Sequence, residues 1–214
     1  MSSALTQTSE VLGDCAADGS PKRRQIVDAA QALFLAHGYG AVSMDAVART
    51  AGVSKATLYA YFDSKDQLFA TIVRERGVSA GLDEHLFPEQ VDDLRAALDR
   101  IGQGVLRFML RERTLAIYRI AIAESARFPE LGRAFHASGP QCFLDRVSAW
   151  LSLQQAAGLV RPADVRVATE QFMALLRSGV FLRASLALPP EPTDAEIDAT
   201  VAAAVDTWQR AFAA

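Results

Sequence analysis

The sequence predicts an all-α protein of roughly nine helices. Apolar residues recur at intervals of three and four along several segments, which places them on one face of a helix. Prolines are absent between Lys22 and Phe87 and are widely spaced after that, so long intervals remain in which a helix can continue. No segment alternates apolar and polar residues as a half-buried strand does, and no Asn-Gly pair indicates a hairpin.

Composition narrows the class of protein. Of the 214 residues, 50% are hydrophobic and 22% are charged, as in globular proteins with a packed core. No apolar run reaches the about 18 residues of a membrane-spanning helix, and the N-terminus lacks the basic and apolar regions of a signal peptide. Cys15 lies in a polar leader and Cys142 in an apolar helix, so we expect no disulfide. These features predict a cytoplasmic protein.

The first predicted helix begins after Ser20, which we expect to be its N-cap, with Pro21 as its first residue. Gly38 is expected to end it. Residues 1–19 are polar and rich in small side chains, so we expect them to be disordered. The helix should bury one apolar face, formed by Ile26, Ala29, Ala30, Leu33 and Phe34.

Two short helices are predicted next. Ser43 is expected to cap a helix from Met44 to Ala51, and Ser54 to cap a second one. Gly52 stands where the chain must turn between them, and a positive φ costs little only for glycine. Two short helices joined by a glycine-containing turn form the helix-turn-helix pattern.

The second short helix carries polar groups on its outer face. Leu58 and Phe62 are four residues apart and should face inward. The hydroxyl groups, ammonium group and aromatic rings that remain can donate to phosphate oxygens or contact base edges. Helix N-termini beside them add backbone N–H groups that suit phosphate. The predicted DNA-binding residues are Lys22, Ser43, Ser54, Lys55, Thr57, Tyr59, Tyr61 and Lys65.

A simpler interpretation is that Tyr59 and Tyr61 cover a hydrophobic seam and that Lys55 is merely solvated. The charge distribution favours DNA binding instead. Residues 21–77 carry eight basic and five acidic residues, whereas the segments on either side are net acidic. We therefore predict double-stranded DNA as a partner.

Later helices have clear start signals. Ser64 is expected to cap a helix, and Thr193 with Glu196 three residues on forms a capping-box pattern before the last helix. The segment EQFMALLRSGVFLRASLAL is expected to be one helix, with Gly179 in its middle giving room for a close neighbour. Gly102 and Gly104 also lie inside a predicted helix, where they make room for a ligand or for a crossing helix.

The segment IVDAAQALFLAHGYGAVSMDAVARTAGVSKATLYAYFDSKDQLF, Ile26 to Phe69, resembles the DNA-binding domain of the TetR family of bacterial repressors. The resemblance implies an all-α homodimer, in which three N-terminal helices bind a palindromic operator and the other helices enclose an effector pocket and build the dimer interface. It implies DNA contacts at Ser43, Lys55, Thr57, Tyr59, Tyr61 and Lys65. Family members often carry a polar or aromatic residue where this chain has Ala60, so a contact there is missing or apolar.

These observations divide the chain into three parts. We expect a leader at 1–19, a helix-turn-helix DNA-binding domain at 20–66, and an effector-binding and dimerisation domain at 67–214. The effector should be small and largely apolar or aromatic, because ligand pockets are mostly apolar with a few polar groups. For each candidate residue the alternative is an ordinary place in the core. The candidates are Phe108, Met109, Tyr118, Arg119, Ile122, His136, Phe143, Trp150, Phe172 and Met173.

The segment 115–126 is apolar nearly all round and is expected to form a buried helix. Arg119 and Glu124 within it need partners, because an unpaired buried charge is costly. They could anchor an effector. We favour an ion pair instead, between Glu124 and Arg127 or an arginine of a neighbouring helix.

The predicted dimer interface combines two apolar helix faces that one chain would not bury alone. The alternative is that both helices pack only within their own protomer. The predicted interface residues are Leu175, Leu176, Gly179, Leu182, Ile197, Val201, Val205 and Trp208.

Other functions receive less support. The chain lacks the G-x-S-x-G, H-E-x-x-H and Walker motifs, and His37, His85 and His136 form no triad pattern with Cys142, so we do not expect an enzyme. We expect no metal and no cofactor, because no cluster has metal-ligand spacing. Two alternatives keep a DNA-bound protein: an adaptor controlled by a protein partner, and a redox sensor through Cys142, which an apolar helix disfavours. The function we expect is a repressor that an effector releases from its operator.

Overall fold

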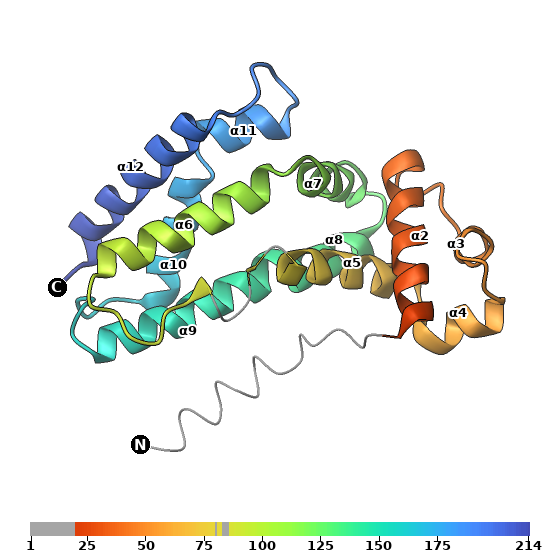
Figure 1. Ribbon diagram of the computed structural model, residues 1–214, viewed down its shortest axis with the longest axis horizontal. Helices are drawn as coiled ribbons and strands as arrows, with labels where there is room; N and C mark the ends of the chain where they lie inside the picture. Colours follow the sequence, from red (N-terminus) through yellow and green to blue (C-terminus); the bar gives the residue numbers. More distant parts are fainter. Residues whose placement is uncertain (1–19, 80, 83–85) are drawn as a thin grey trace. The chain divides into compact units, whose positions relative to one another are not determined.

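The computed structural model confirms the all-α class (Figure 1). It describes residues 20–79, 81–82 and 86–214, so the predictions made for the leader at 1–19, for Cys15 and for His85 lie outside the described residues. No helix in these ranges is long and apolar enough to cross a membrane. In chain order the helices are α2 (Pro21–His37), α3 (Met44–Thr50), α4 (Lys55–Tyr61), α5 (Lys65–Ser79), α6 (Leu94–Leu110), α7 (Glu112–Glu124), α8 (Pro129–His136), the π-helical turn η3 (Ala137–Gln141), α9 (Cys142–Ala156), α10 (Val165–Leu176), α11 (Gly179–Ser185) and α12 (Asp194–Phe212).

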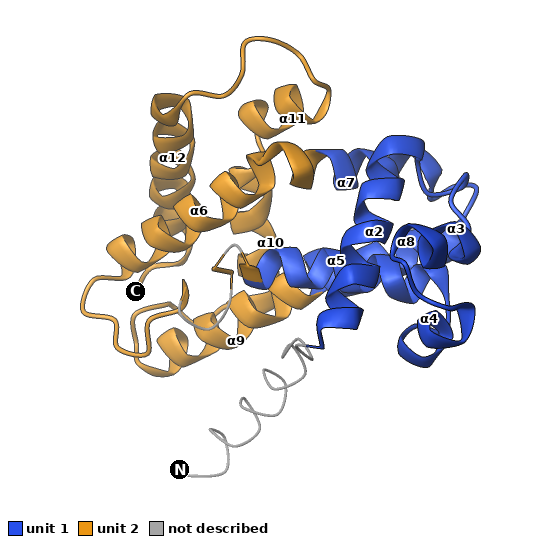
Figure 2. Ribbon diagram, turned by 45° about the vertical axis from the view of Figure 1, so that its right-hand side comes forward, with its two compact units in different colours: residues 1–78, 116–141 blue, residues 79–115, 142–214 orange. Residues whose placement is uncertain are grey.

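The chain folds into two compact units (Figure 2). Unit 1 contains α2 to α5 together with residues 116–141, and unit 2 contains residues 79–115 and 142–214. The helix α7 therefore begins in unit 2 and ends in unit 1. The association of residues 116–141 with the N-terminal helices was not foreseen, because it depends on contacts between segments far apart in the sequence.

One hydrophobic core joins the N-terminal helices to α7 and α8 within unit 1. Ile117 of α7 and Leu131 of α8 are buried in the same cluster as the residues of α2 to α5. The helix-turn-helix segment thus shares its core with helices that follow it by more than fifty residues. The buried members from α2 to α5 and their turns are Ile26, Val27, Ala30, Phe34, Tyr39, Val42, Val47, Ala48, Leu58, Phe62, Leu68, Phe69 and Ile72.

The predicted local signals at the two short helices are present. The Ser43 Oγ accepts a hydrogen bond from the Ala46 N–H at 3.1 Å, and the Ser54 Oγ accepts one from the Thr57 N–H at 3.0 Å. Gly52 adopts φ +66° in the turn between them, in the left-handed region that glycine reaches without strain. These bonds satisfy N–H groups that the first turn of a helix leaves unpaired.

Ser20 differs from its prediction. It precedes α2, but its side chain makes no capping bond. Its Oγ lies 3.0 Å from the Tyr61 Oη instead, which hydrogen-bonds the start of α2 to the end of α4.

In unit 2, α6 packs closely against α12. A Cβ on Gly102 would lie 2.8 Å from Val201 Cγ1, closer than real contacts allow, so glycine is what permits this approach. A Cβ on Gly104 would lie 2.9 Å from Leu86 Cδ1. Gly102 therefore makes room for a crossing helix, as one alternative held, whereas Gly104 makes room for Leu86, which lies in the segment between α5 and α6. Arg107 pairs with Asp194 and with Asp198 along the same helix pair.

The expected continuous helix across residues 170–188 was wrong. α10 ends at Leu176, and α11 begins at Gly179. A Cβ on Gly179 would meet nothing within 4 Å, so within one chain this glycine marks no close helix contact. The apolar spacing continues through the break because both helices bury a face, and for this reason periodicity did not reveal it.

The expectation of a helix buried all round at 115–126 was also wrong. Leu115, Ile117 and Ala121 are buried, but Ile122 is 62% exposed and Ala123 is exposed too. Small and apolar residues on an outward face leave no periodic signal, so the sequence alone did not separate the two faces.

The capping box at the start of α12 gives a first testable prediction. The Thr193 Oγ1 accepts from the Glu196 N–H at 3.2 Å, while Glu196 Oε2 accepts from the Thr193 N–H at 3.0 Å. The bond from the Thr193 N–H to the carboxylate, followed by the bond from Arg183, lowers the pKa of Glu196. We expect Thr193→Ala to lower the free energy of unfolding by about 1 kcal/mol, measured by denaturant titration followed by helical circular dichroism.

Thr207→Ala in the same helix is the matched control. Its hydroxyl only bonds back to the Ala203 carbonyl, and alanine is the better helix former, so no loss is expected. Equal losses in the two variants would show that the capping box contributes nothing.

Candidate nucleic-acid interface

The outer face of α4 presents Lys55 and Tyr59 to solvent. Leu58 is fully buried and anchors the helix, and Tyr59 is 48% exposed. The Lys55 Nζ donates to Asp45 Oδ2 at 2.5 Å, and both side chains remain largely exposed. An exposed pair of this kind contributes little free energy, so Lys55 can exchange Asp45 for a phosphate at small cost.

Ala56 and Ala60 are also exposed on α4. Between them, the Thr57 Oγ1 lies 2.8 Å from the Ser54 Oγ. The exposed surface of this helix therefore alternates polar groups with methyl groups. Such a surface can offer hydrogen bonds to base edges together with apolar contact to thymine methyl groups.

The two tyrosines of α4 have different surroundings. Tyr61 is half-buried, packs against the core of unit 1, and bonds to Ser20 through its hydroxyl. The interpretation as a seam-covering residue fits Tyr61, whereas Tyr59 points its ring to solvent. Of the pair, only Tyr59 has the exposure that reading a groove requires.

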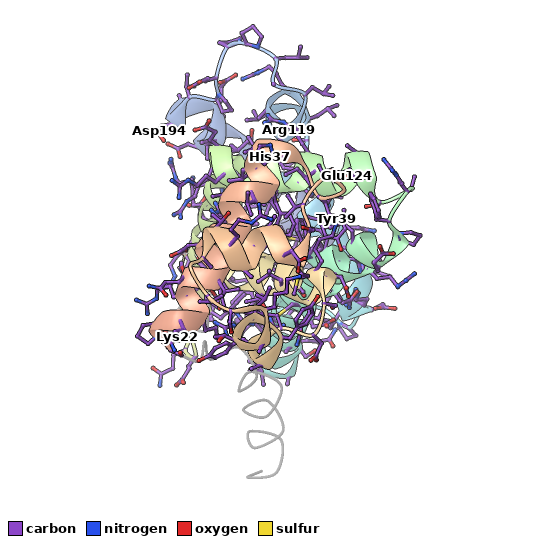
Figure 3. All side chains as sticks on the ribbon, turned by 90° about the vertical axis from the view of Figure 1, so that its right-hand side faces the viewer. Lys22, His37, Tyr39, Arg119, Glu124 and Asp194 are labelled. Carbon is purple, nitrogen blue, oxygen red and sulfur yellow. The ribbon has the colours of Figure 1, made fainter. Side chains whose placement is uncertain are left out.

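The predicted phosphate-contacting residues are spread over four elements. Lys22 is exposed in the first turn of α2, at the opposite end of that helix from His37 (Figure 3). Ser43 and Ser54 are exposed N-caps of α3 and α4, so their hydroxyl groups already hold backbone N–H groups. A phosphate at these places would therefore contact the helix N-termini more than the serine hydroxyls.

Lys65 is placed differently from the prediction. Its Nζ donates to the Tyr39 carbonyl at 2.8 Å and to the Val42 carbonyl at 2.9 Å. It also lies 4.1 Å from the centroid of the Tyr39 ring and 5.5 Å from that of Phe128. Burial lowers the pKa of Lys65, against the opposing effect of Glu124 and Glu130. This ammonium group is engaged by the turn between α2 and α3, which disfavours a direct role at phosphate.

Glu124, the last residue of α7, holds the same turn. The Tyr39 N–H donates to Glu124 Oε1 and the Gly40 N–H donates to Oε2, both at 2.7 Å. Figure 3 shows Tyr39 and Glu124 lying beside each other. From the sequence we favoured an ion pair between Glu124 and an arginine, with an effector anchor as the alternative. In the structure the Glu124 carboxylate accepts two backbone N–H groups. The only sign in the sequence was the pair of glycines, Gly38 and Gly40, on either side of a tyrosine.

The ring of Tyr39 is buried among other aromatic rings. It stacks on Phe34 at 5.5 Å between centroids and meets Phe69 and Phe128 edge-on at 5.7 and 5.5 Å. Burial, followed by the nearby carboxylates of Asp66, Glu130 and Glu124, raises the pKa of Tyr39. The turn is thus fixed by its ring as well as by its backbone.

The candidate effector residues are divided between the units. Tyr118, Arg119, Ile122 and His136 belong to unit 1, and the other six belong to unit 2. Ile122 and His136 are exposed, and Tyr118 packs on Phe135 at 6.2 Å between ring centroids.

In unit 2, two of the candidates occupy ordinary core positions. Phe172 is fully buried and meets Trp208 edge-on at 6.2 Å. Trp150 is buried, and its Nε1–H donates to the Pro88 carbonyl at 3.0 Å. Four candidates in this unit keep partly exposed side chains: Phe108, Met109, Phe143 and Met173.

Five of the eight predicted dimer residues are buried within one chain: Leu176, Ile197, Val201, Val205 and Trp208. The Trp208 Nε1–H donates to the Ala168 carbonyl of α10, at 2.8 Å. The alternative of packing within one protomer therefore describes this stripe. A different face of α10 and α12 lies open as a hollow, lined by Leu175, Ser178, Ala199, Thr200, Ala203, Ala204 and Thr207.

Comparison with known proteins connects this geometry to a family. Residues 26–72 match the profile described as "Bacterial regulatory proteins, tetR family", and residues 96–214 match "AefR-like transcriptional repressor, C-terminal domain". A regulator from Rhizobium meliloti, "HTH-type transcriptional regulator BetI", is 30% identical over 184 residues, which cover 86% of this chain and 73% of that protein. Other curated relatives match over shorter stretches, between 24% and 52% of their own length.

Solved structures of regulators also resemble this chain. The structure named "Flavonoid-responsive Regulator FrrA" is 35% identical, with a TM-score of 0.76 over 90% of this chain and 97% of that chain. A TetR-family transcriptional regulator from Mesorhizobium loti has a TM-score of 0.77 over 93% of this chain and 100% of that chain. At 24% identity, the second likeness concerns the fold alone.

The crowding around Gly38 gives a second testable prediction. Gly38 adopts φ +78°, and a Cβ there would lie 2.7 Å from Glu124 Oε1, which its two backbone bonds hold in place. Gly52 is the matched control, because it has φ +66° and open space around its Cβ position. Gly52→Ala should lose about 1 kcal/mol through its positive φ.

Gly38→Ala should lose at least about 1 kcal/mol more than Gly52→Ala. Its ψ of 170° lies in a region that is essentially reserved for glycine, and its methyl group would also displace the carboxylate. Urea titration of the two variants measures the difference. If both variants unfold at the same midpoint, neither the backbone conformation nor the carboxylate constrains position 38.

Proposed function

The chain belongs to the TetR family of transcriptional regulators, which are not enzymes, and we propose that it is a repressor that binds a palindromic operator as a homodimer and leaves it when an effector binds. Regulators of this family bind DNA and dimerise. Repression is supported by the profile of a transcriptional repressor over residues 96–214. Acting on chromosomal DNA would place the protein in the bacterial cytoplasm.

The exposed polar face of α4 carries the DNA-binding proposal. A buried Leu58 fixes this helix to the core, while Lys55 and Tyr59 project from it into solvent. In helix-turn-helix dimers the second helix enters the major groove, and the spacing of the two copies sets the distance between half-sites. Thr57 and the methyl groups of Ala56 and Ala60 would then complete the surface that meets the bases.

An aromatic effector is the second part of the proposal. The 35% identical structure is named as a flavonoid-responsive regulator, which suggests a planar aromatic ligand for this chain as well. The partly exposed Phe108, Met109, Phe143 and Met173 have the apolar character that such a ligand requires. The effector can weaken operator binding only by its difference in affinity for the two states of the protein.

A homodimer through the open face of α10 and α12 is the third part. Small residues line this hollow, so a second copy of the same helices can approach closely. Leu182 and Leu186 in and after α11 are 58% and 59% exposed, although they are large and apolar. Burying such a surface is a usual reason for dimers to be stable.

The DNA-binding proposal is tested by the double variant Lys55→Ala, Tyr59→Ala. It should weaken binding to a duplex selected by the wild-type chain from a randomised pool by about 2 kcal/mol or more, which is roughly thirtyfold in affinity. Fluorescence anisotropy at fixed salt measures the loss, and circular dichroism checks that the helices remain.

Arg166→Ala is the control, because it removes a positive charge from unit 2, where Arg166 pairs with Asp145 and Glu170. It should leave affinity nearly unchanged. Wild-type affinity in the double variant would show that α4 does not read the operator.

The dimer proposal is tested by Ala203→Glu. Two carboxylates facing each other across the hollow would be desolvated without partners, so the variant should sediment as a monomer at concentrations where the wild type is a dimer. Ala149→Glu, at an exposed position of α9, is the control and should leave the dimer intact. A dimeric Ala203→Glu variant would move the interface elsewhere.

A further inference from the structure

The turn between α2 and α3, residues 38–42, is held by two side chains of opposite charge. The Glu124 carboxylate accepts the N–H groups of Tyr39 and Gly40, each at 2.7 Å and each on its own oxygen. The Lys65 ammonium group donates to the carbonyl groups of Tyr39 and Val42 at 2.8 and 2.9 Å. Hydrogen bonds with a charged partner are stronger than neutral ones. The backbone of this turn is therefore fixed on its donor side and on its acceptor side.

The fit of the carboxylate to the turn is close. A Cβ on Gly38 would lie 2.7 Å from Glu124 Oε1, and a Cβ on Gly40 would lie 2.9 Å from Oε2 and 2.9 Å from the Phe128 ring. Glycine at both positions leaves the space that the carboxylate occupies. The site is built around this one side chain, since larger residues on either side of Tyr39 would collide with it.

The turn leads directly into the DNA-binding helices. Val42, whose carbonyl Lys65 holds, is followed by Ser43, the N-cap of α3. α3 in turn packs with α4 in the core of unit 1 through Val47, Ala48 and Leu58. A displacement of the turn would therefore change where α3 begins and how α4 is presented.

Glu124 is also the end of a helix that starts in the other unit. α7 runs without interruption from Glu112 to Glu124, and its first residues belong to unit 2.

We propose that Glu124 is a positioning residue for DNA recognition, which holds the turn at residues 38–42 in the geometry that α3 and α4 need. The inference rests on the proposed DNA-binding function. It assigns to Glu124 no contact with DNA and no contact with an effector.

Charge alone predicts the opposite effect of removing this carboxylate. A negative side chain near a DNA-binding surface repels phosphates, so its neutralisation should strengthen binding to DNA. A positioning role predicts weaker binding. In Glu124→Gln the amide oxygen can accept one N–H, while the amide NH2 group faces the other N–H and cannot accept it.

The experiment compares Glu124→Gln with Glu130→Gln in the full chain. Glu130 lies in the first turn of α8 and interacts with Tyr39 and Lys65 only through its charge, so it is a matched control for the loss of one negative charge nearby. Using the duplex selected by the wild type, we expect about tenfold weaker binding for Glu124→Gln. Glu130→Gln should bind equally well or slightly more tightly.

A second readout separates positioning from general loss of stability. Hydrogen–deuterium exchange at the Tyr39 and Gly40 amides should speed up in Glu124→Gln, while amides in the middle of α5 keep their wild-type rates. Glu124→Asp keeps the charge but shortens the reach by one methylene group, so it should also expose these amides and weaken binding. This variant carries the test if the glutamine variant does not fold.

The outcomes are distinct. If the wild-type chain selects no duplex, the proposed function fails and this inference falls with it. If the wild type binds and both Glu124 variants bind as tightly as it does, the positioning role is wrong while the proposed function stands. Faster exchange at Tyr39 and Gly40 together with weaker binding, and no loss in Glu130→Gln, supports the proposal.

Discussion

Burial of the Tyr39 ring is the constraint on which unit 1 depends. Its contacts with Phe34, Phe69 and Phe128 draw the backbone of the α2–α3 turn against the core. Buried N–H and carbonyl groups are costly unless they are paired. Within the turn, the Val42 N–H donates to the Tyr39 carbonyl at 3.3 Å, but the Tyr39 and Gly40 N–H groups and the Val42 carbonyl bond to side chains outside it. Glu124 and Lys65 supply those partners from two different helices. Packing of one ring and pairing of one turn thus bind α2, α5, α7 and α8 into the body that presents α3 and α4.

The candidate DNA interface consists of the side chains that this core leaves exposed. Tyr61 and Lys65, which the sequence offers as DNA contacts, are engaged by Ser20 and by the turn. Lys55 and Tyr59 stay at the surface, because their side of α4 faces away from the core that Leu58 anchors. The division of one short helix into an anchored side and an exposed side is what makes it suitable for a groove.

Much of the fold could be predicted because its signals are local. Ser43, Ser54 and the pair of Thr193 and Glu196 cap their helices as expected, since a cap depends on residues no more than three positions away. Gly38 and Gly52 likewise adopt the positive φ that turns require. The function was predicted from the family resemblance over Ile26 to Phe69, because helix propensities carry no information about function.

Several of the wrong predictions concern which side of a helix contacts a distant segment of the chain. The stripe Ile197 to Trp208 is buried by α6 and α10 in its own chain, although the same spacing would suit a partner. The sequence predicts that Glu124 has a basic partner, whereas the fold brings two backbone N–H groups to its carboxylate. The sequence likewise suggests that Lys65 is an exposed cation, because the two carbonyl groups that it binds belong to a turn far from it in the sequence.

Ala60, exposed on α4 one residue after Tyr59, has an evolutionary consequence. Its methyl group holds no part of the core, so a larger or polar side chain there would change the operator surface without a cost in packing. Ala56 lies one turn before it and is equally exposed. Point mutations at these two positions would let descendants of this protein acquire new target sequences while the scaffold stays the same.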